Sequence, residues 1–261
     1  MSNLSLAVRD SSTMLRRNLL HARRYPSLTL NLLLTPVMLL LLFVYVFGDA
    51  MSAGIGGGDR SDYVAYLVPG LLLMTIGSTT IGTAVSVSND MTEGIIARFR
   101  TMAIHRGSVL VGHVIGSVVQ SIMSVVLVGA VGVAIGFRSS DATVLEWLAA
   151  FGLVVLFTLA MTWIAVGMGL VSPNAEAASN NALPLIFLPL ISSAFVPVDS
   201  MPGWFRPIAE YQPFTPAIET LRGLLLGTGI GHNGWLALGW CLALTALGYV
   251  WATSKFNSDP K

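Results

Sequence analysis

Charged residues divide the chain into long stretches that contain none of them. Six stretches of 22 to 32 residues hold no Asp, Glu, Lys or Arg: 25–48, 63–89, 107–137, 147–175, 177–198 and 223–254. A helix needs about 20 apolar residues to cross the hydrocarbon core of a bilayer. The spacing therefore predicts six transmembrane helices in one domain, residues 27–254.

The composition agrees with a membrane-embedded, all-α protein. Hydrophobic residues make up 54% of the chain and charged residues only 10%, and the mean hydropathy is +0.74. A soluble domain carries roughly 25% charged residues. Runs such as Leu39-Leu40-Leu41-Leu42 are apolar on every face, whereas strands of a transmembrane barrel alternate apolar and polar residues. We therefore expect helices and not a barrel.

Several kinds of chemistry are excluded by what the chain lacks. The net charge of +1 gives no nucleic-acid footprint, and Cys241 is the single cysteine, which rules out an intrachain disulfide. The sequence has no H-E-x-x-H zinc motif and no G-x-S-x-G nucleophile motif. We expect no catalytic residue, no metal ligand and no cofactor site in this chain.

The distribution of Lys and Arg predicts the orientation, because these residues stay preferentially on the cytoplasmic side. Ten of the fourteen lie in the N-terminal segment, the second connection and the C-terminal tail: Arg9, Arg16, Arg17, Arg23, Arg24, Arg98, Arg100, Arg106, Lys255 and Lys261. The other four share the alternate connections with most of the acidic residues. Both termini are therefore expected in the cytoplasm, including the tail 255–261.

Residues 1–26 have the pattern of an amphipathic helix. Leu4, Val8, Leu15 and Leu19 fall on one face of a helical wheel and the arginines on another. Such a helix would lie in the cytoplasmic headgroup layer, with arginines toward lipid phosphates or a partner. A simpler alternative is a positive flank that only sets the orientation of the first span.

The cytoplasmic connection at about 91–106 also predicts a short helix. Ile95, Phe99 and Met102 recur at i, i+4 and i+7 and form an apolar stripe beside Glu93, Arg98 and Arg100. This helix has no core of its own, so it either lies on the bilayer or docks into a cytoplasmic partner. The mixture of acids and arginines favours docking.

The last exterior segment, about 198–233, is unusually rich in proline and in aromatic residues. Proline interrupts helices, so we expect short, broken, amphipathic helices at the outer leaflet, with part of the segment re-entering the membrane. Four aromatic residues are candidates for an exterior gate packed against the span ends: Trp204, Phe205, Tyr211 and Phe214. The alternative is a plain extracellular cap.

On these features the chain resembles the permeases of type-2 ATP-binding-cassette (ABC) exporters, particularly the daunorubicin-resistance permease group. The resemblance lies in six spans, an amphipathic N-terminal helix, Glu93-Gly94 followed by Arg98-Phe99-Arg100, and a long stretch near the fifth span. That stretch includes Val171-Ser172-Pro173, Pro184, 192–197 (SSAFVP), 201–205 (MPGWF) and 212–216 (QPFTP).

The resemblance implies a permease that exports a hydrophobic or amphipathic small molecule, such as a drug, an antibiotic or a lipid, across a bacterial plasma membrane. ATP hydrolysis needs a G-x-x-x-x-G-K-[ST] loop, and this chain has no lysine before Lys255. ATP and Mg²⁺ would therefore bind to a separate ATPase subunit, present in two copies. A second permease, identical or paralogous, would complete the transporter.

Two alternative functions remain open at this stage. Polysaccharide or glycolipid exporters share the architecture and differ in cargo. An ion-coupled secondary transporter is a different class, but proton-coupled carriers need ionisable groups within the membrane, and the six stretches contain no carboxylate.

Overall fold

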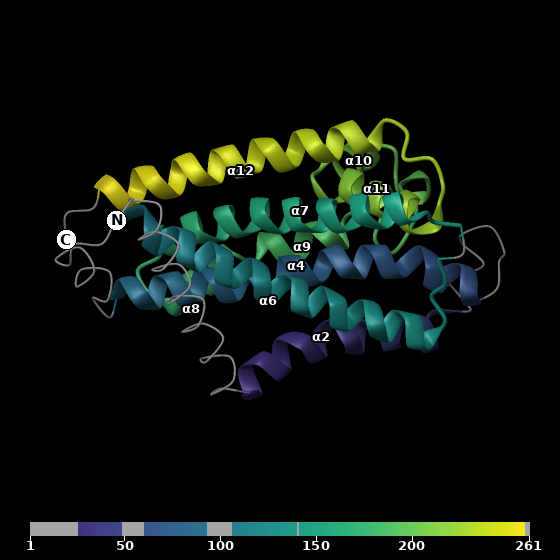
Figure 1. Cartoon of the computed structure of the whole chain (residues 1–261), viewed down its shortest axis with the longest axis horizontal. Helices are drawn as coiled ribbons and strands as arrows, with labels where there is room; N and C mark the ends of the chain where they lie inside the picture. Colours follow the sequence, from purple (N-terminus) through teal and green to yellow (C-terminus); the bar gives the residue numbers. More distant parts are fainter. Residues whose placement is uncertain (1–25, 49–59, 93–105, 140, 259–261) are drawn as a thin grey trace.

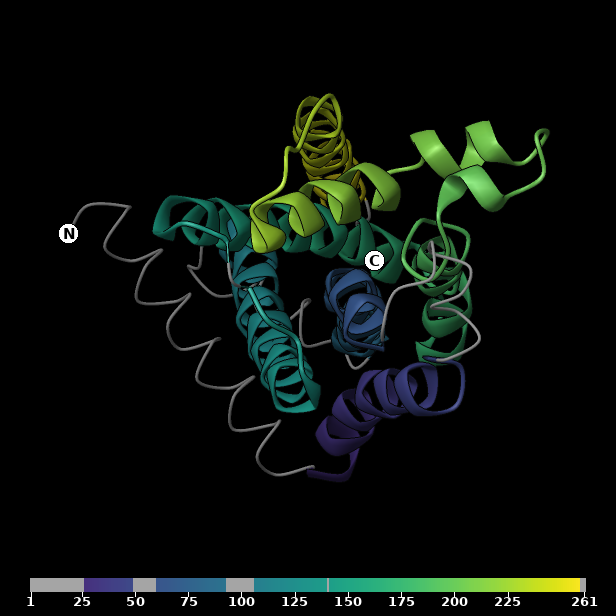
Figure 2. The same cartoon turned by 90° about the vertical axis from the view of Figure 1, so that its right-hand side faces the viewer.

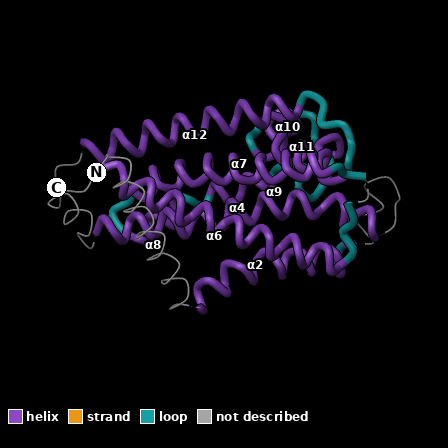
Figure 3. The backbone as a smooth tube through the Cα atoms, in the orientation of Figure 1, coloured by secondary structure: helices purple, strands orange, loops and turns teal. Residues whose placement is uncertain are grey.

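The computed structural model describes residues 26–48, 60–92, 106–139 and 141–258. Every regular element in this part of the chain is helical (Figure 3), which confirms the all-α prediction. The elements are α2 (Pro26–Tyr45), α4 (Arg60–Thr92), α6 (Arg106–Ile135), α7 (Val144–Val171), α8 (Ala175–Asn181), α9 (Pro184–Leu190), η1 (Val198–Ser200), α10 (Arg206–Tyr211), α11 (Phe214–Leu226) and α12 (Asn233–Ser258).

The long helices run side by side along the long axis of the molecule (Figure 1). Four are long and apolar enough to cross a membrane, namely Ser61–Thr92, Leu110–Ile135, Val144–Val171 and Asn233–Phe256. The apolar stretch Leu34–Tyr45 of α2 is shorter within the residues searched. The structure thus supports a multi-pass membrane protein, with four candidate spans where the charge pattern predicts six.

The predicted fifth span differs most from expectation. Instead of one helix over 177–198, the chain forms α8 and α9, each seven residues long. Pro184 begins α9 and Pro189 lies within it. Proline has no amide hydrogen to donate to the carbonyl group four residues earlier, and Pro184 stands where α8 has ended and α9 begins. Both short helices pack on α4.

Helix α4 is the centre of the bundle. It contacts α2, α6, α7, α8, α9 and α11, and Figure 2 shows it surrounded by its neighbours. In its most apolar window 78% of the residues are buried, against 22% for α12. Leu67, Leu71 and Ile76 have no exposed surface. Its hydroxyl side chains Thr75, Thr79 and Thr80 are buried as well and donate to backbone carbonyl oxygens one turn earlier in the helix, so every face finds a partner.

The outer faces of α6 and α12 are apolar and open. Met123 and Val126 on α6, and Leu242, Leu247 and Val250 on α12, are each about 60% exposed. A water-soluble protein rarely leaves so much contiguous apolar surface uncovered. These faces are suited to lipid.

The segment after α9 is less broken than predicted. Helix α11 runs for 13 residues, and eleven of them are buried. Pro213 is its N-cap residue and Pro216 lies in its first turn, where helical amide groups have no intrahelical acceptor in any case. These two prolines therefore start a helix and do not interrupt one. Gly227 ends it with a φ of +66°, a conformation that favours glycine.

Candidate functional site

A buried polar cluster joins α11 to α4 at one end of the bundle, the end at which α10 and α11 lie in Figure 1. Its centre is Arg222, which is 8% exposed. The guanidinium donates to the carbonyl oxygen of Tyr66 from Nε (3.2 Å) and Nη2 (3.0 Å), and to the carbonyl oxygen of Ser193 from Nη2 (3.0 Å). Its Nη1 lies 2.6 Å from Oε1 of Glu219. One side chain thus ties three separate segments together.

The side chain of Tyr66 completes this cluster. Its ring lies 3.7 Å from the guanidinium carbon of Arg222, close enough for a cation–π contact. Its hydroxyl donates to the carbonyl oxygen of Ser193 at 2.8 Å. Pro69 lies one turn further along α4 and cannot donate to the carbonyl of Ala65. The helical hydrogen bond to Ala65 is therefore missing, and the next residue, Tyr66, is the one whose carbonyl oxygen accepts from Arg222.

The turn that carries Ser193 lies directly on the backbone of α4. A Cβ at Gly70 would come within 2.7 Å of the Cα of Ala194, and one at Gly77 would collide with the carbonyl oxygen of Leu185. Only glycine permits so close an approach at these two positions. The two glycines, seven residues apart, therefore set the path of α9 and the following turn along α4.

The QPFTP stretch, 212–216, connects the same parts. Nε2 of Gln212 donates to the carbonyl oxygen of Leu188 (3.3 Å), and its Oε1 accepts from the amide of Phe214 (3.1 Å). Oγ1 of Thr215 accepts from the amide of Ser193 (3.3 Å) and donates to the carbonyl oxygen of Ala209. These bonds satisfy backbone groups where α9, α10 and α11 meet, and they explain why polar residues stand in so apolar a sequence.

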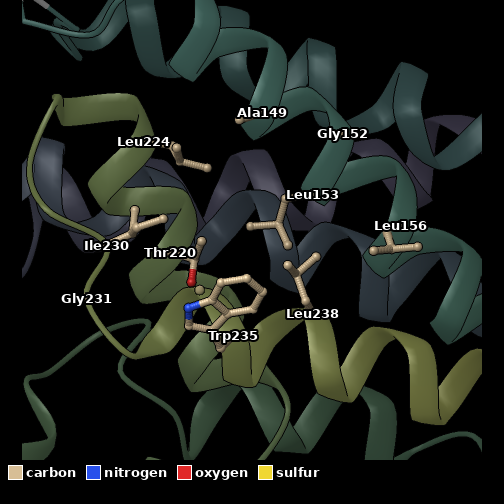
Figure 4. Close-up of a pocket in the computed structure, with 11 residues that line it drawn as sticks. Ala149, Gly152, Leu153, Leu156, Thr220, Leu224, Ile230, Gly231, Trp235 and Leu238 are labelled. Carbon is tan, nitrogen blue, oxygen red and sulfur yellow. The ribbon is translucent and has the colours of Figure 1, made fainter.

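The opposite side of α11 borders an apolar hollow of about 560 Å³ between α7, α11 and α12. Figure 4 shows Leu153, Leu224 and Leu238 pointing into it, with the Trp235 indole beside Thr220. The Thr220 hydroxyl already donates to the carbonyl oxygen of Pro216 at 2.7 Å. Ligand pockets usually measure about 300–1,000 Å³. The hollow suits an apolar group better than a charged one.

The four predicted gate residues do not form one cluster. Trp204 is 78% exposed and contacts Phe205 edge to face, with ring centroids 5.4 Å apart. Tyr211 is also exposed, whereas Phe214 is fully buried and packs on Phe157 at 5.0 Å. The expected burial of Trp204 against the span ends is not found in the single chain. Short helices separated by prolines hold these aromatics at different depths.

The residues of the helix that we expect to dock into the ATPase and couple it to the spans, Glu93, Arg98, Phe99, Arg100 and Met102, lie outside the described residues, as does the amphipathic segment 1–25. The helices on either side of 93–105 are described. Near their ends, Oδ2 of Asp90 on α4 lies 2.9 Å from Nε2 of His113 on α6. Neither this pair nor the cluster around Arg222 follows from the pattern of residues along the sequence.

Two small residues within the spans have packing roles. Gly132 on α6 packs against Val68 of α4, so this glycine serves packing within the chain. Cys241 is fully buried, as a packing residue would be. No group of three or more His, Cys, Asp or Glu side chains that could hold a metal ion occurs in the described ranges.

Comparisons with known proteins give the family. The model of the ABC-2 type transporter family matches residues 10–226. The daunorubicin resistance ABC transporter permease protein DrrB1 of Streptomyces coeruleorubidus is 27% identical over 226 residues, which cover 85% of this chain and 77% of that protein.

More distant relatives match over shorter or weaker alignments. The probable doxorubicin resistance ABC transporter permease protein DrrC of Mycobacterium tuberculosis is 24% identical over 160 residues, 59% of this chain and 57% of that protein. Nodulation protein J of Rhizobium meliloti is 23% identical over 213 residues, 74% of each chain. The resemblance drawn from the motifs is confirmed, and the chain belongs to the ABC-2 type transporter family.

Proposed function

We propose that this chain is the permease subunit of an ABC exporter that moves a hydrophobic or amphipathic small molecule out across a bacterial plasma membrane. The observation that carries the proposal is the similarity to a daunorubicin resistance permease over 85% of the chain. The six charge-free stretches and the apolar hollow beside α11 support such a cargo, because a strongly charged molecule would find little compensation there. ATP-driven uptake of daunorubicin into inside-out vesicles tests this function.

The energy source in this proposal is a second polypeptide. The only lysines are Lys255 and Lys261, and neither belongs to a G-x-x-x-x-G-K-[ST] loop. We infer two ATPase subunits, which bind ATP and Mg²⁺, and two permeases, identical or paralogous. The segment 91–106 is the proposed docking helix, with Phe99 and Met102 as apolar anchors and Glu93, Arg98 and Arg100 as polar contacts.

The topology proposed for the membrane has six crossings. Helices α2, α4, α6, α7 and α12 supply five, and α8 with α9 supplies a broken crossing between α7 and the exterior segment. Irregular backbone at membrane depth must be buried in protein, and both short helices pack on α4. The distribution of Lys and Arg supports cytoplasmic termini, with residues 1–26 on the inner membrane surface.

The exterior segment is the proposed outer gate. Helix α11 is attached to α4 through Arg222 and also contacts α7 and α12, so a movement of the long helices reaches it directly. Trp204, Phe205, Tyr211 and Phe214 belong to this gate in our proposal, with Phe214 as its inner anchor. The exposed Trp204 and Tyr211 are then available to a second permease, to lipid or to the cargo.

The orientation predicts which positions a membrane-impermeant thiol reagent can reach. Single cysteines at Ser52, Ser140 and Ser200 should react in intact cells when Cys241 is replaced by alanine, because all three lie outside in the proposed topology. A cysteine at Ser254 should react only after the cells are permeabilised. Reaction at Ser254 in intact cells would reverse the orientation, and protection of Ser200 would remove the gate from the outer surface.

A further inference from the structure

Asp90 and His113 form a buried polar pair between the two helices that flank residues 93–105. The carboxylate oxygen Oδ2 and the ring nitrogen Nε2 are 2.9 Å apart, and the side chains of His113 and Asp90 are 6% and 11% exposed. Both partners are held away from water, where such a hydrogen bond is strong. The geometry is that of a fixed contact between α4 and α6.

The position of this pair along the chain is informative. Asp90 lies two residues before the end of α4 at Thr92, and His113 lies seven residues after the start of α6 at Arg106. At 1.5 Å per residue, His113 is only about 10 Å along α6 from its first residue. The pair therefore fastens the two helices close to the points where the segment 93–105 leaves one and enters the other.

The surroundings of the pair connect it to the rest of the bundle. Val87 on α4 and Leu110 and Val114 on α6 belong to an apolar cluster that also contains Trp163 of α7 and Phe256 of α12. The first three of these residues lie within three positions of Asp90 or His113. Four helices thus pack together at the level of this one polar contact.

A second polar contact lies further along the same pair of helices. Oγ1 of Thr79 and Oγ of Ser121 are 2.7 Å apart, and both residues are buried. Thr79 precedes Asp90 by eleven residues, so this contact lies deeper in the bundle, away from the segment 93–105. It provides a matched comparison, because it joins the same helices at a different level.

We propose that Asp90 and His113 act as a positioning clamp, which makes the ends of α4 and α6 move as one body when the segment 93–105 is displaced. Without the clamp, a push on that segment would separate the two helix ends instead of moving the bundle. The proposal rests on the proposed function, in which the displacement comes from the ATPase. Neither residue needs to contact the ATPase or the cargo.

The functional test measures transport per ATP hydrolysed. Asp90→Leu and His113→Phe, each alone, should lower this ratio at least tenfold while the ATPase still co-purifies and hydrolyses ATP. The exchange variant Asp90→His/His113→Asp should restore most of it, because the same two groups face each other again. The control Thr79→Val/Ser121→Ala should stay within about twofold of the parent ratio.

A second measurement is independent of transport. Spin labels on cysteines at Asn89 and Val111, both exposed, report the separation of the helix ends in a Cys241→Ala background. The distribution of distances should be narrow in the parent, broad in Asp90→Leu and narrow again in the exchange variant. An unchanged distribution in Asp90→Leu overturns the clamp, as does an unchanged transport ratio. A parent that shows no ATP-driven transport refutes the proposed function instead and leaves the spin-label result to decide the clamp.

Discussion

Replacement of Phe99 by alanine should abolish transport while the amount of permease in the membrane stays near the parent level. In the proposed exporter, force from the ATPase reaches the spans through a cytoplasmic contact, and 91–106 is the sizeable connection between spans on that side. A central aromatic anchor at an interface often contributes 2 kcal/mol or more to binding. Co-purification of the ATPase with the Phe99→Ala permease should therefore weaken by at least tenfold.

The effect at Phe99 has a matched control on the same segment. Arg98→Ala should weaken ATPase binding more mildly and in a salt-dependent way, because a charge at the rim of an interface contributes mainly to orientation and association rate. If Phe99→Ala loses transport but binds the ATPase fully, Phe99 would be needed to transmit the movement and not to hold the ATPase. Full binding with full export would show that 91–106 is not the coupling segment.

Replacement of Arg222 by methionine should destabilise the permease by roughly 1.5–3 kcal/mol, the range for hydrogen bonds that involve a charged group, because the guanidinium is buried while the Glu219 side chain is 31% exposed. The change leaves the carbonyl oxygens of Tyr66 and Ser193 without their guanidinium donor and the carboxylate of Glu219 without its counter-ion. Methionine keeps most of the length of the side chain, so the decrease in the free energy of unfolding reflects lost polar contacts more than lost packing. Denaturation of the purified permease in detergent measures it.

Arg206 on α10 is the control for this prediction. Its guanidinium pairs with Asp199 and lies 4.0 Å from Glu210, but its side chain is 48% exposed. Exposed ion pairs contribute about 1 kcal/mol or less, so Arg206→Met should leave the unfolding midpoint almost unchanged. The stability of the Arg222→Lys permease should lie between those of Arg222→Met and Arg206→Met, because an ammonium group cannot reproduce the several directed hydrogen bonds made by a guanidinium. Equal stability of the Arg222→Met and Arg206→Met permeases would contradict the role given to the cluster.

The charge pattern located the long helices because the physics behind it is simple. A span can contain few charges, so 63–89, 107–137, 147–175 and 223–254 each fall largely within one described helix, namely α4, α6, α7 and α12. The absence of charge does not indicate whether a stretch forms one unbroken helix. The stretch 177–198 is free of charge, yet it is divided between α8 and α9. Pro184 and Pro189 are the residues that carried this information.

The depth of charged residues was harder to infer. Arg222 and Glu219 counted as exterior charges because they lie in a connection, whereas the structure buries Arg222. A charge at the edge of an apolar stretch can face water or find partners inside the protein. The partners of Arg222, Tyr66 and Ser193, are distant from it in sequence. Asp90 and His113 are a similar case. Periodicity along one helix does not report a contact between two helices, although an isolated histidine within a span was a signal.

In the proposed function, ATP hydrolysis on a separate subunit drives this permease to move a hydrophobic small molecule outward. Uptake of daunorubicin into inside-out membrane vesicles measures this movement, because the vesicle lumen corresponds to the exterior. We expect ATP-dependent accumulation when the permease and its ATPase are both present, and none with either alone or with the lysine of the ATPase phosphate loop replaced. Accumulation by the permease alone, without ATP and abolished by an ionophore, would contradict the account and assign the chain to ion-coupled transport.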